Sequence, residues 1–183
     1  HAFLMFPLRN LGTLLDAQGR HDDAIVYHQR ALAIGERTLG PEHSDVADAV
    51  YYLAENRRLS GALDEALRLH RRATAIWERD GGAEHPYVAW GLTGIGEVEL
   101  AAGRAKPAIA PLERALAIRV VEEGDPLERA RTRFALARAL WDAGGERARA
   151  KALAAEARAD LVAAGPRAAD MIGQLDAWTS RRR

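Results

Sequence analysis

Gly40-Pro41-Glu42-His43 is matched 42 residues later by Gly82-Ala83-Glu84-His85. The same step relates small and apolar residues along most of the chain. A period of roughly 20 to 50 residues is typical of solenoid proteins, in which one structural unit is stacked on the next. The sequence therefore predicts an array of 42-residue units. The residues that recur at this step are Gly19, Gly61 and Gly103; Ala24, Ala66, Ala108 and Ala150; Ala31, Ala73, Ala115 and Ala157; and Ile34, Ile76 and Ile118.

Each unit is predicted to contain two helices. In the first unit, Leu8, Leu11 and Leu15 recur at three- and four-residue steps, which places them on one face of an α-helix, the predicted core face. Gly19 is expected to end that helix, because glycine adopts the left-handed conformation found at many helix ends. A second helix is predicted to run up to Gly40-Pro41, with inner positions Ala24, Ala31 and Ile34.

Small residues mark the places where helices are expected to approach each other closely. Gly12 lies on the predicted first helix, where a small side chain allows the two helices of the pair to cross. A glycine inside a helix costs about 1 kcal/mol relative to alanine, so close packing is its expected purpose. Ser44 or Asp45 is expected to cap the helix that opens the second unit. The first helix of the third unit contains three such glycines: Gly91, Gly94 and Gly96.

The predicted fold is therefore all-α: a right-handed superhelical solenoid of about four helix-turn-helix repeats. We expect a single array over residues 1–183, with repeats at about 1–42, 43–84, 85–124 and 125–164. Apolar residues at helical spacing then predict a capping helix at 166–179, which covers the last repeat. At the other end Phe3, Leu4 and Phe6 lie where a preceding repeat would pack, so we expect the chain to begin inside a longer array. The apolar residues of the capping helix are Met171, Ile172, Leu175 and Trp178.

These units resemble tetratricopeptide repeats of the 42-residue kinesin-light-chain type. The resemblance is carried by Leu11-Gly12, by residues 19–24 and 30–34, and by Leu39-Gly40-Pro41-Glu42-His43, and it is seen again over residues 111–118. It implies stacked helix pairs and a role in protein binding. Kinesin light chains carry an asparagine pair before a Leu-Ala motif, and that pair is mostly lost here, so their cargo-peptide preference is not transferred. The four places read Arg9-Asn10, Tyr51-Tyr52, Thr93-Gly94 and Phe134-Ala135.

Composition excludes several classes of function. The 26 basic and 26 acidic residues cancel, so the chain has no electrostatic footprint for nucleic acid or an anionic membrane. The absence of cysteine excludes disulfides and thiol chemistry. Alanine accounts for 38 of the 183 residues, which favours helices. No stretch approaches the ~20 apolar residues of a membrane span, and we expect a cytoplasmic location.

No catalytic motif is present, and we predict neither enzymatic activity nor a cofactor. The sequence contains no phosphate-binding P-loop, no His-Glu-x-x-His motif and no recognisable Ser-His-Asp arrangement. His28 and His70 occupy equivalent positions in successive repeats, which are too far apart to share a metal ion, so no metal site is predicted. His43 and His85 are expected to serve in the turns between repeats.

A ligand is expected to bind along the first helices of the pairs, which line the inner face of such an array. The positions beside the core leucines carry both charge signs and several aromatic side chains, and arginine and aromatic residues are favoured at binding hot spots. We expect Tyr51, Trp90 and Arg138 to be exposed there. The predicted peptide-binding groove comprises Arg9, Thr13, Tyr51, Glu55, Arg58, Trp90, Glu97, Phe134, Arg138 and Trp141.

Three functions agree with these observations. The first is a non-catalytic scaffold that binds a peptide or protein segment in the groove. The second is a regulatory or substrate-recruiting region of a larger signalling enzyme, because residues 135–141 and the capping helix resemble the ends of repeat arrays in bacterial serine/threonine kinases. The third is an oligomerisation module that self-associates through the uncapped N-terminal end. No nucleic-acid or membrane partner is predicted.

Overall fold

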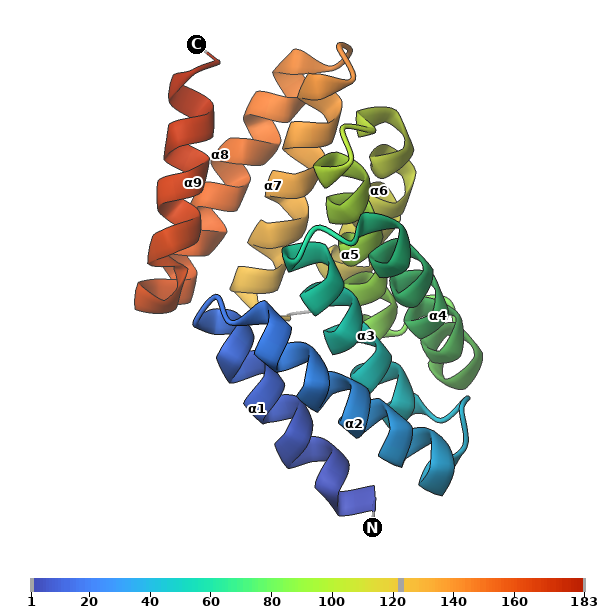
Figure 1. The fold of residues 1–183 in the computed structure, drawn as a ribbon. Helices are drawn as coiled ribbons and strands as arrows, with labels where there is room; N and C mark the ends of the chain where they lie inside the picture. The colour runs from blue at the N-terminus through green and yellow to red at the C-terminus, as the bar shows by residue number, and fades with distance from the viewer. Residues whose placement is uncertain (1, 122–123, 183) are drawn as a thin grey trace. The chain divides into compact units, whose positions relative to one another are not determined.

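The computed structural model describes residues 2–121 and 124–182, and these residues form helices joined by short turns (Figure 1). They divide into two compact units, one up to Gly94 and one from Ile95 onward, so the boundary falls inside a helix. The predicted repeat borders stay a prediction. The elements are η1 (Ala2–Leu4), α1 (Met5–Ala17), α2 (His21–Leu39), α3 (Ser44–Leu59), α4 (Leu63–Gly81), α5 (Pro86–Ala101), α6 (Ala105–Val121), α7 (Pro126–Asp142), α8 (Arg147–Ala164), η2 (Gly165–Ala168) and α9 (Ala169–Ser180).

The predicted glycine stops are confirmed. Gly19, after α1, has a φ of 74°, and Gly40, after α2, has a φ of 90°. Residues with a side chain rarely adopt these values, so glycine turns the chain at the end of both helices. The predicted cap at Ser44 or Asp45 is wrong, because His43 occupies the N-cap position of α3. Its ring Nδ1 accepts a hydrogen bond of 3.1 Å from the backbone N–H of Asp45.

In the first unit, α1 packs on α2, α2 on α3, and α3 on α4 (Figure 1). The alanines that recur at 42-residue steps are fully buried where the helices of a pair cross. Gly12 allows α1 to approach α2, since a Cβ atom at this position would lie 2.6 Å from Cε1 of His28. Leu15 is buried as predicted. Leu11 was expected in the core, but it is exposed. The helices that pack on α1, which are α2 and α3, cover a different face of it.

The three glycines of α5 serve the close packing that was predicted. Within the first unit, a Cβ atom at Gly91 would lie 2.1 Å from the Thr74 hydroxyl oxygen, and one at Gly94 would lie 2.3 Å from the His70 ring. Within the second unit, a Cβ atom at Gly96 would lie 2.3 Å from Cγ of Leu112. The absence of a side chain at each position is therefore required by a neighbouring buried group.

In the second unit, α6 packs on α7, α7 on α8, and α8 on α9. The C-terminal helix α9 buries Leu175 and Trp178 in the same apolar core as α7 and α8. A buried carboxylate also ties α8 to α7. Asp160 accepts hydrogen bonds from Arg129 and Arg133, and its carboxylate raises the pKa of Arg129. The last helix pair is therefore held by apolar packing together with a charged cluster.

Candidate peptide-binding site

The clearest hollow in the second unit lies between α7 and α9. Phe134 and Arg138 are one helical turn apart on α7, and Trp178 on α9 faces them. The Phe134 and Trp178 rings meet edge to face, with their centroids 5.8 Å apart. Trp141 meets Trp178 in the same way, at 5.9 Å. Phe134 and Trp178 are each only 8% exposed and belong to the apolar core of the second unit, so Phe134, predicted as a groove residue, shows only its edge to the hollow.

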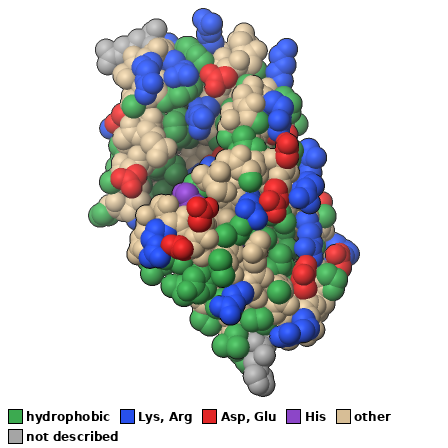
Figure 2. Space-filling model, in the orientation of Figure 1, with side chains coloured by type: hydrophobic (Ala, Val, Ile, Leu, Met, Phe, Trp, Pro, Cys, Tyr) green, Lys and Arg blue, Asp and Glu red, His purple; other side chains and the backbone are tan. Residues whose placement is uncertain are grey.

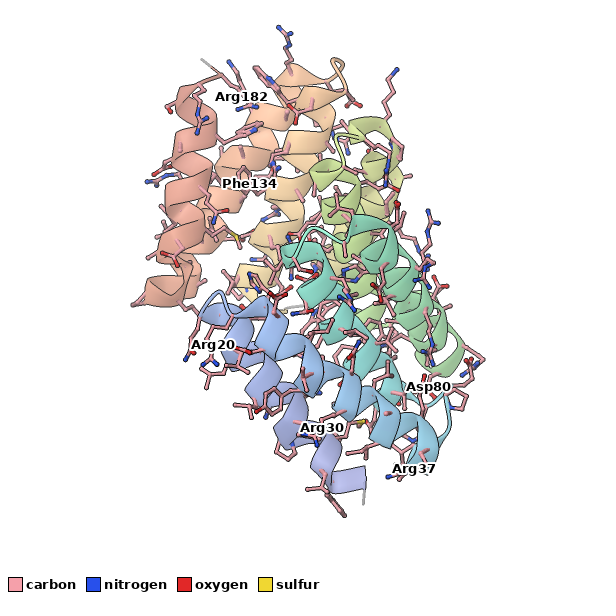
Figure 3. The ribbon with its side chains drawn as sticks, in the orientation of Figure 1. Arg20, Arg30, Arg37, Asp80, Phe134 and Arg182 are labelled. Atoms are coloured by element: carbon pink, nitrogen blue, oxygen red, sulfur yellow. The ribbon has the colours of Figure 1, made fainter. Side chains whose placement is uncertain are left out.

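Arginine side chains cover the edges of this aromatic surface. The Arg138 guanidinium lies 5.9 Å from the centroid of the Phe134 ring, and that of Arg182 lies 4.6 Å from a Trp178 ring. Both distances are within the range of cation–π attraction. Arg182 also lies 3.6 Å from a carboxylate oxygen of Asp142. Figure 3 shows Phe134 on α7 and Arg182 beyond the end of α9.

The hollow has a volume of about 880 Å³ and a net positive lining. Arg138, Arg181 and Asp170 form no ion pair within the part of the chain that the structure describes, residues 2–121 and 124–182. Two cations and one anion therefore remain available to a ligand. Its lining residues are Phe134, Arg138, Asp142, Ala169, Asp170, Gly173, Gln174, Ala177, Trp178, Arg181 and Arg182.

A second polar and aromatic surface lies on α1 and α3 of the first unit. The Arg9 guanidinium lies 3.3 Å from Asp48 and 5.0 Å from the centroid of the Tyr52 ring. Burial raises the pKa of Asp48, while the charge of Arg9 opposes that rise. Thr13 is exposed one turn further along α1, and its hydroxyl donates to the Arg9 carbonyl. Arg9 and Thr13 therefore lie one turn apart on the same face of α1.

Tyr51 does not lie exposed on this surface, which corrects the expectation for that residue. Its exposed fraction is 4%, because its ring is enclosed by aromatic neighbours. The centroid of the Tyr51 ring lies 5.4 Å from His70, 5.9 Å from Trp77 and 5.7 Å from Trp90. Trp90 itself is half-buried, as is Arg138, rather than fully exposed. The sequence pattern placed Tyr51 and Trp90 on the same predicted face, but it did not predict that Tyr51 is buried beneath the partly exposed Trp90.

The remaining charged residues of the predicted groove are engaged with one another. In the first unit, Arg58 donates to Glu55 at 2.9 Å, and the other Glu55 oxygen lies 3.1 Å from Nε2 of His70. In the second unit, both oxygens of Glu97 accept from Arg131, at 2.8 Å for the Arg131 Nε. These carboxylates are therefore neutralised within the protein rather than presented alone.

The contribution of α9 to the site was missed by sequence reasoning. The prediction assigned this helix only a covering role, yet Trp178 and Arg182 complete the hollow. Trp178 carried the usable signal, since a tryptophan on a terminal helix has both an apolar body and a polar N–H. The contact between Phe134 and Trp178 could not be predicted, because the two residues are far apart in the sequence and lie on different helices.

His28 lies in a buried polar cluster and not in a site open to ligands. Its Nε2 lies 2.8 Å from one oxygen of Asp16, and His21 Nδ1 lies 2.8 Å from the other. Asn56 of α3 donates to Asp16 at 2.9 Å and so links the second helix pair to the first. Burial lowers the pKa of His28, against the opposing effect of Asp16. Among residues 2–121 and 124–182, no group of three or more His, Asp or Glu side chains is arranged to hold a metal ion.

Comparisons with known proteins identify the class of this chain. The model of the tetratricopeptide repeat family matches residues 4–79 and 45–119. The chain therefore belongs to the tetratricopeptide repeat family, an all-α helical repeat fold of the solenoid class. Repeats of this family generally mediate protein–protein interactions. No curated protein matches the sequence, and none of the described helices is long and apolar enough to cross a membrane.

The similar solved structures are kinesin-light-chain-like. The BtubC (BKLC) protein from P. vanneervenii is 25% identical with a TM-score of 0.76, over 88% of this chain and 65% of that one. This chain thus spans about two thirds of BtubC. The kinesin-light-chain protein with nearly identical TPR-like repeats from Podosopora anserina is 24% identical with a TM-score of 0.65, over 88% and 77%. A second structure of that protein is 25% identical with a TM-score of 0.67, over 85% and 74%.

Proposed function

We propose that this protein is a non-catalytic scaffold that binds a peptide or protein segment along the first helices of its repeats. The observation that carries the proposal is the hollow between α7 and α9. It combines the exposed edges of the largely buried Phe134 and Trp178 rings with the cations Arg138 and Arg181, which have no acidic partner among the described residues. The hollow is lined by both polar and apolar groups, and a concavity in which several polar groups converge beside apolar ones can bind and orient a ligand.

The ligand favoured by this lining is a segment with an apolar side chain next to a carboxylate. The apolar group would contact the exposed edges of the Phe134 and Trp178 rings, and the carboxylate would pair with Arg138 or Arg181. An arginine that is half-buried over an aromatic ring is partly desolvated, so its pairing with a carboxylate is worth more than a fully exposed pair. On the second unit, Trp141 adjoins the hollow through Trp178. Arg9, Thr13 and Trp90 form a separate predicted contact surface on the first unit. Buried Tyr51 supports Trp90 from below.

A peptide array tests this proposal directly. Peptides that pair an apolar residue with Asp or Glu should bind, and the same peptides with Asn, Gln or Lys in place of the acid should not. Affinity for the best peptide, measured by fluorescence anisotropy, should fall roughly tenfold or more in Arg138→Ala, as at binding hot spots. Trp90→Ala tests the first unit in the same way. Arg71→Ala, an exposed arginine on the second helix α4, is the matched control and should retain affinity. Unchanged peptide affinity in both Arg138→Ala and Trp90→Ala would exclude the predicted binding residues on both units.

The alternative, a recruiting region of a larger bacterial signalling enzyme such as a serine/threonine kinase, uses the same site. It rests on the resemblance of residues 135–141 to kinase-attached arrays. It differs in what the bound segment is for, since the captured peptide would then contain a residue that the enzyme modifies. The domain order of the full-length protein distinguishes the two: a kinase domain in the same chain supports the recruiting role, and its absence removes it.

A further inference from the structure

Four aromatic rings of the first unit form a closed cluster that reaches the surface at α5. The ring centroid of Tyr51, on α3, lies 5.7 Å from that of Trp90 and 5.9 Å from that of Trp77. The ring of Tyr87 closes the cluster, at 5.5 Å from Trp90 and 5.6 Å from Trp77. Tyr51 and Trp77 are buried, whereas Tyr87 is 41% exposed and Trp90 is half-buried. Two buried rings therefore hold two surface rings in place.

The repeat fold does not require these rings. One period earlier, the same places are taken by charged residues or glycine, and α1, α2 and α3 form there without an aromatic cluster. Aromatic side chains that the fold does not need are frequent at binding hot spots. The residues 42 positions before Tyr51, Trp77, Tyr87 and Trp90 are Arg9, Gly35, Asp45 and Asp48.

The charged groups beside the cluster are already paired. Tyr52, which is half-buried, extends the aromatic surface, since its ring lies 5.4 Å from that of Tyr51. The Arg9 guanidinium lies 5.0 Å from the Tyr52 ring and donates to Asp48 at 3.3 Å. Figure 2 likewise shows acidic and basic side chains next to one another over α1 and α2. A charged ligand therefore finds no unpaired opposite charge here, and Arg9 disfavours a cationic one.

The polar groups that remain for a ligand are hydrogen-bond donors. The side chains of Tyr87 and Trp90 form no hydrogen bond within residues 2–121 and 124–182. The Trp90 indole N–H can only donate, and the Tyr87 hydroxyl can donate. A proline residue offers a carbonyl acceptor and no N–H, and a polyproline II helix leaves its carbonyls without internal partners. An uncharged, acceptor-rich segment therefore complements this surface.

We propose that the surface of Tyr52, Tyr87 and Trp90 binds an uncharged proline-rich segment in the polyproline II conformation. Proline rings would pack on the aromatic rings, and Trp90 and Tyr87 would donate to backbone carbonyls. Ring steps of 5.7 Å and 5.4 Å through Tyr51 separate Trp90 from Tyr52, which suits prolines one turn of about 9 Å apart. The inference rests on the proposed role of the first unit in ligand binding, and it assigns that unit a ligand of its own.

A labelled polyproline peptide of about nine residues, with its C-terminus amidated, tests the inference by fluorescence anisotropy. The natural chain should bind it, and Tyr87→Ala should lower the affinity about tenfold or more. Trp90→Phe keeps a packing ring and removes only the N–H, so the affinity should fall about fivefold, as for one lost neutral hydrogen bond. Tyr27→Ala, a half-buried tyrosine on α2 outside the cluster, is the matched control and should bind like the natural chain.

Each contrary outcome has a clear reading. No binding of the polyproline peptide, or equal affinity in the natural chain, Tyr87→Ala and Trp90→Phe, would overturn the inference. A trimethyl-lysine peptide or an oligosaccharide that binds through Tyr87 in its place would overturn it as well. The amidated polyproline peptide has no carboxylate, so it does not test the hollow between α7 and α9. If it binds and the acidic peptides do not, the proposal for that hollow fails and this one stands; the reverse result overturns this one alone.

Discussion

Single atoms decide how closely the helices of this protein pack. A Cβ atom at Gly12 or Gly96 would meet a buried side chain at less than 3 Å, while Gly173, in the middle of α9, has no atom within 4 Å of the same position. Glycine is thus required for close helix packing at positions 12 and 96, whereas the packing does not require it at position 173. The small residues that recur in the sequence are therefore of two kinds, which only the packing separates.

Replacement of two glycines by alanine should give effects of opposite sign. Gly96→Ala forces Cγ of Leu112 away from a position 2.3 Å from the new atom and should destabilise by about 1–3 kcal/mol. Gly173→Ala removes backbone freedom without a clash and should stabilise by up to about 1 kcal/mol. Urea unfolding of both variants and the natural chain checks this. Equal effects of the two substitutions would contradict the packing account.

The buried ring of His28 should make stability depend on pH. Its pKa in the folded protein is lowered from 6.5, so below that value the unfolded chain binds more protons than the folded one. Stability is therefore complete above pH 6.5 and falls as the pH drops from 6.5 toward the lowered pKa. His28→Leu, which copies the equivalent Leu112, should flatten this fall. Urea unfolding between pH 8 and 5 measures how the free energy of unfolding depends on pH. If His28→Leu shows the same pH dependence as the natural chain, other groups cause it.

Among the elements, α9 both packs on the last helix pair and lines the hollow that we propose as a binding site. Its inner face buries Leu175 and Trp178 against the core of α7 and α8, while its end supplies Arg181 and Arg182 to the hollow. A cap needs only the apolar face. The arginines and the exposed Asp170 give this helix its proposed additional role in ligand selection.

Truncation of a single side chain should loosen α9. Leu175 is 1% exposed, and Leu175→Ala should destabilise by about 2–4 kcal/mol through lost contact and a cavity. The helix should then be cleaved faster by protease, and peptide affinity should fall with it, because the hollow loses one wall. Val162→Ala truncates an aliphatic side chain on α8 that is 61% exposed and does not line the hollow, and it is the control. Normal protease resistance in Leu175→Ala would show that α9 does not depend on this contact.

At the scale of the whole molecule, stability should be local. In repeat proteins each helix pair contacts only its neighbours. A destabilising substitution should therefore increase local unfolding mainly in its own pair and the adjacent one. Gly12→Ala, which pushes on His28 in the first unit, should speed amide exchange in α1 to α3. Amides of α7 and α8 should keep their rates, as mass spectrometry of deuterium uptake would reveal. Uniform acceleration along the chain would instead indicate one cooperative unit.

Sequence reasoning recovered the fold well and the site only in part. The helix stops at Gly19 and Gly40 and the buried phased alanines were predictable, because they depend on local backbone geometry and on a period repeated four times. The burial of Tyr51 and the participation of Trp178 were not predictable. Both depend on neighbours distant in the chain, Trp77 and Trp90 in one case and Phe134 in the other.

The helical repeat class of this chain could be read from the 42-residue period and the turn glycines, because these features act over a few residues and need no tertiary information. The availability of surface residues could not, because it depends on how separate helices pack. Glu97 and Arg131 neutralise each other, whereas the half-buried Arg138 has no acidic partner among the described residues. Ion pairing and burial are set by distances between separate helices, and a linear pattern does not contain those distances.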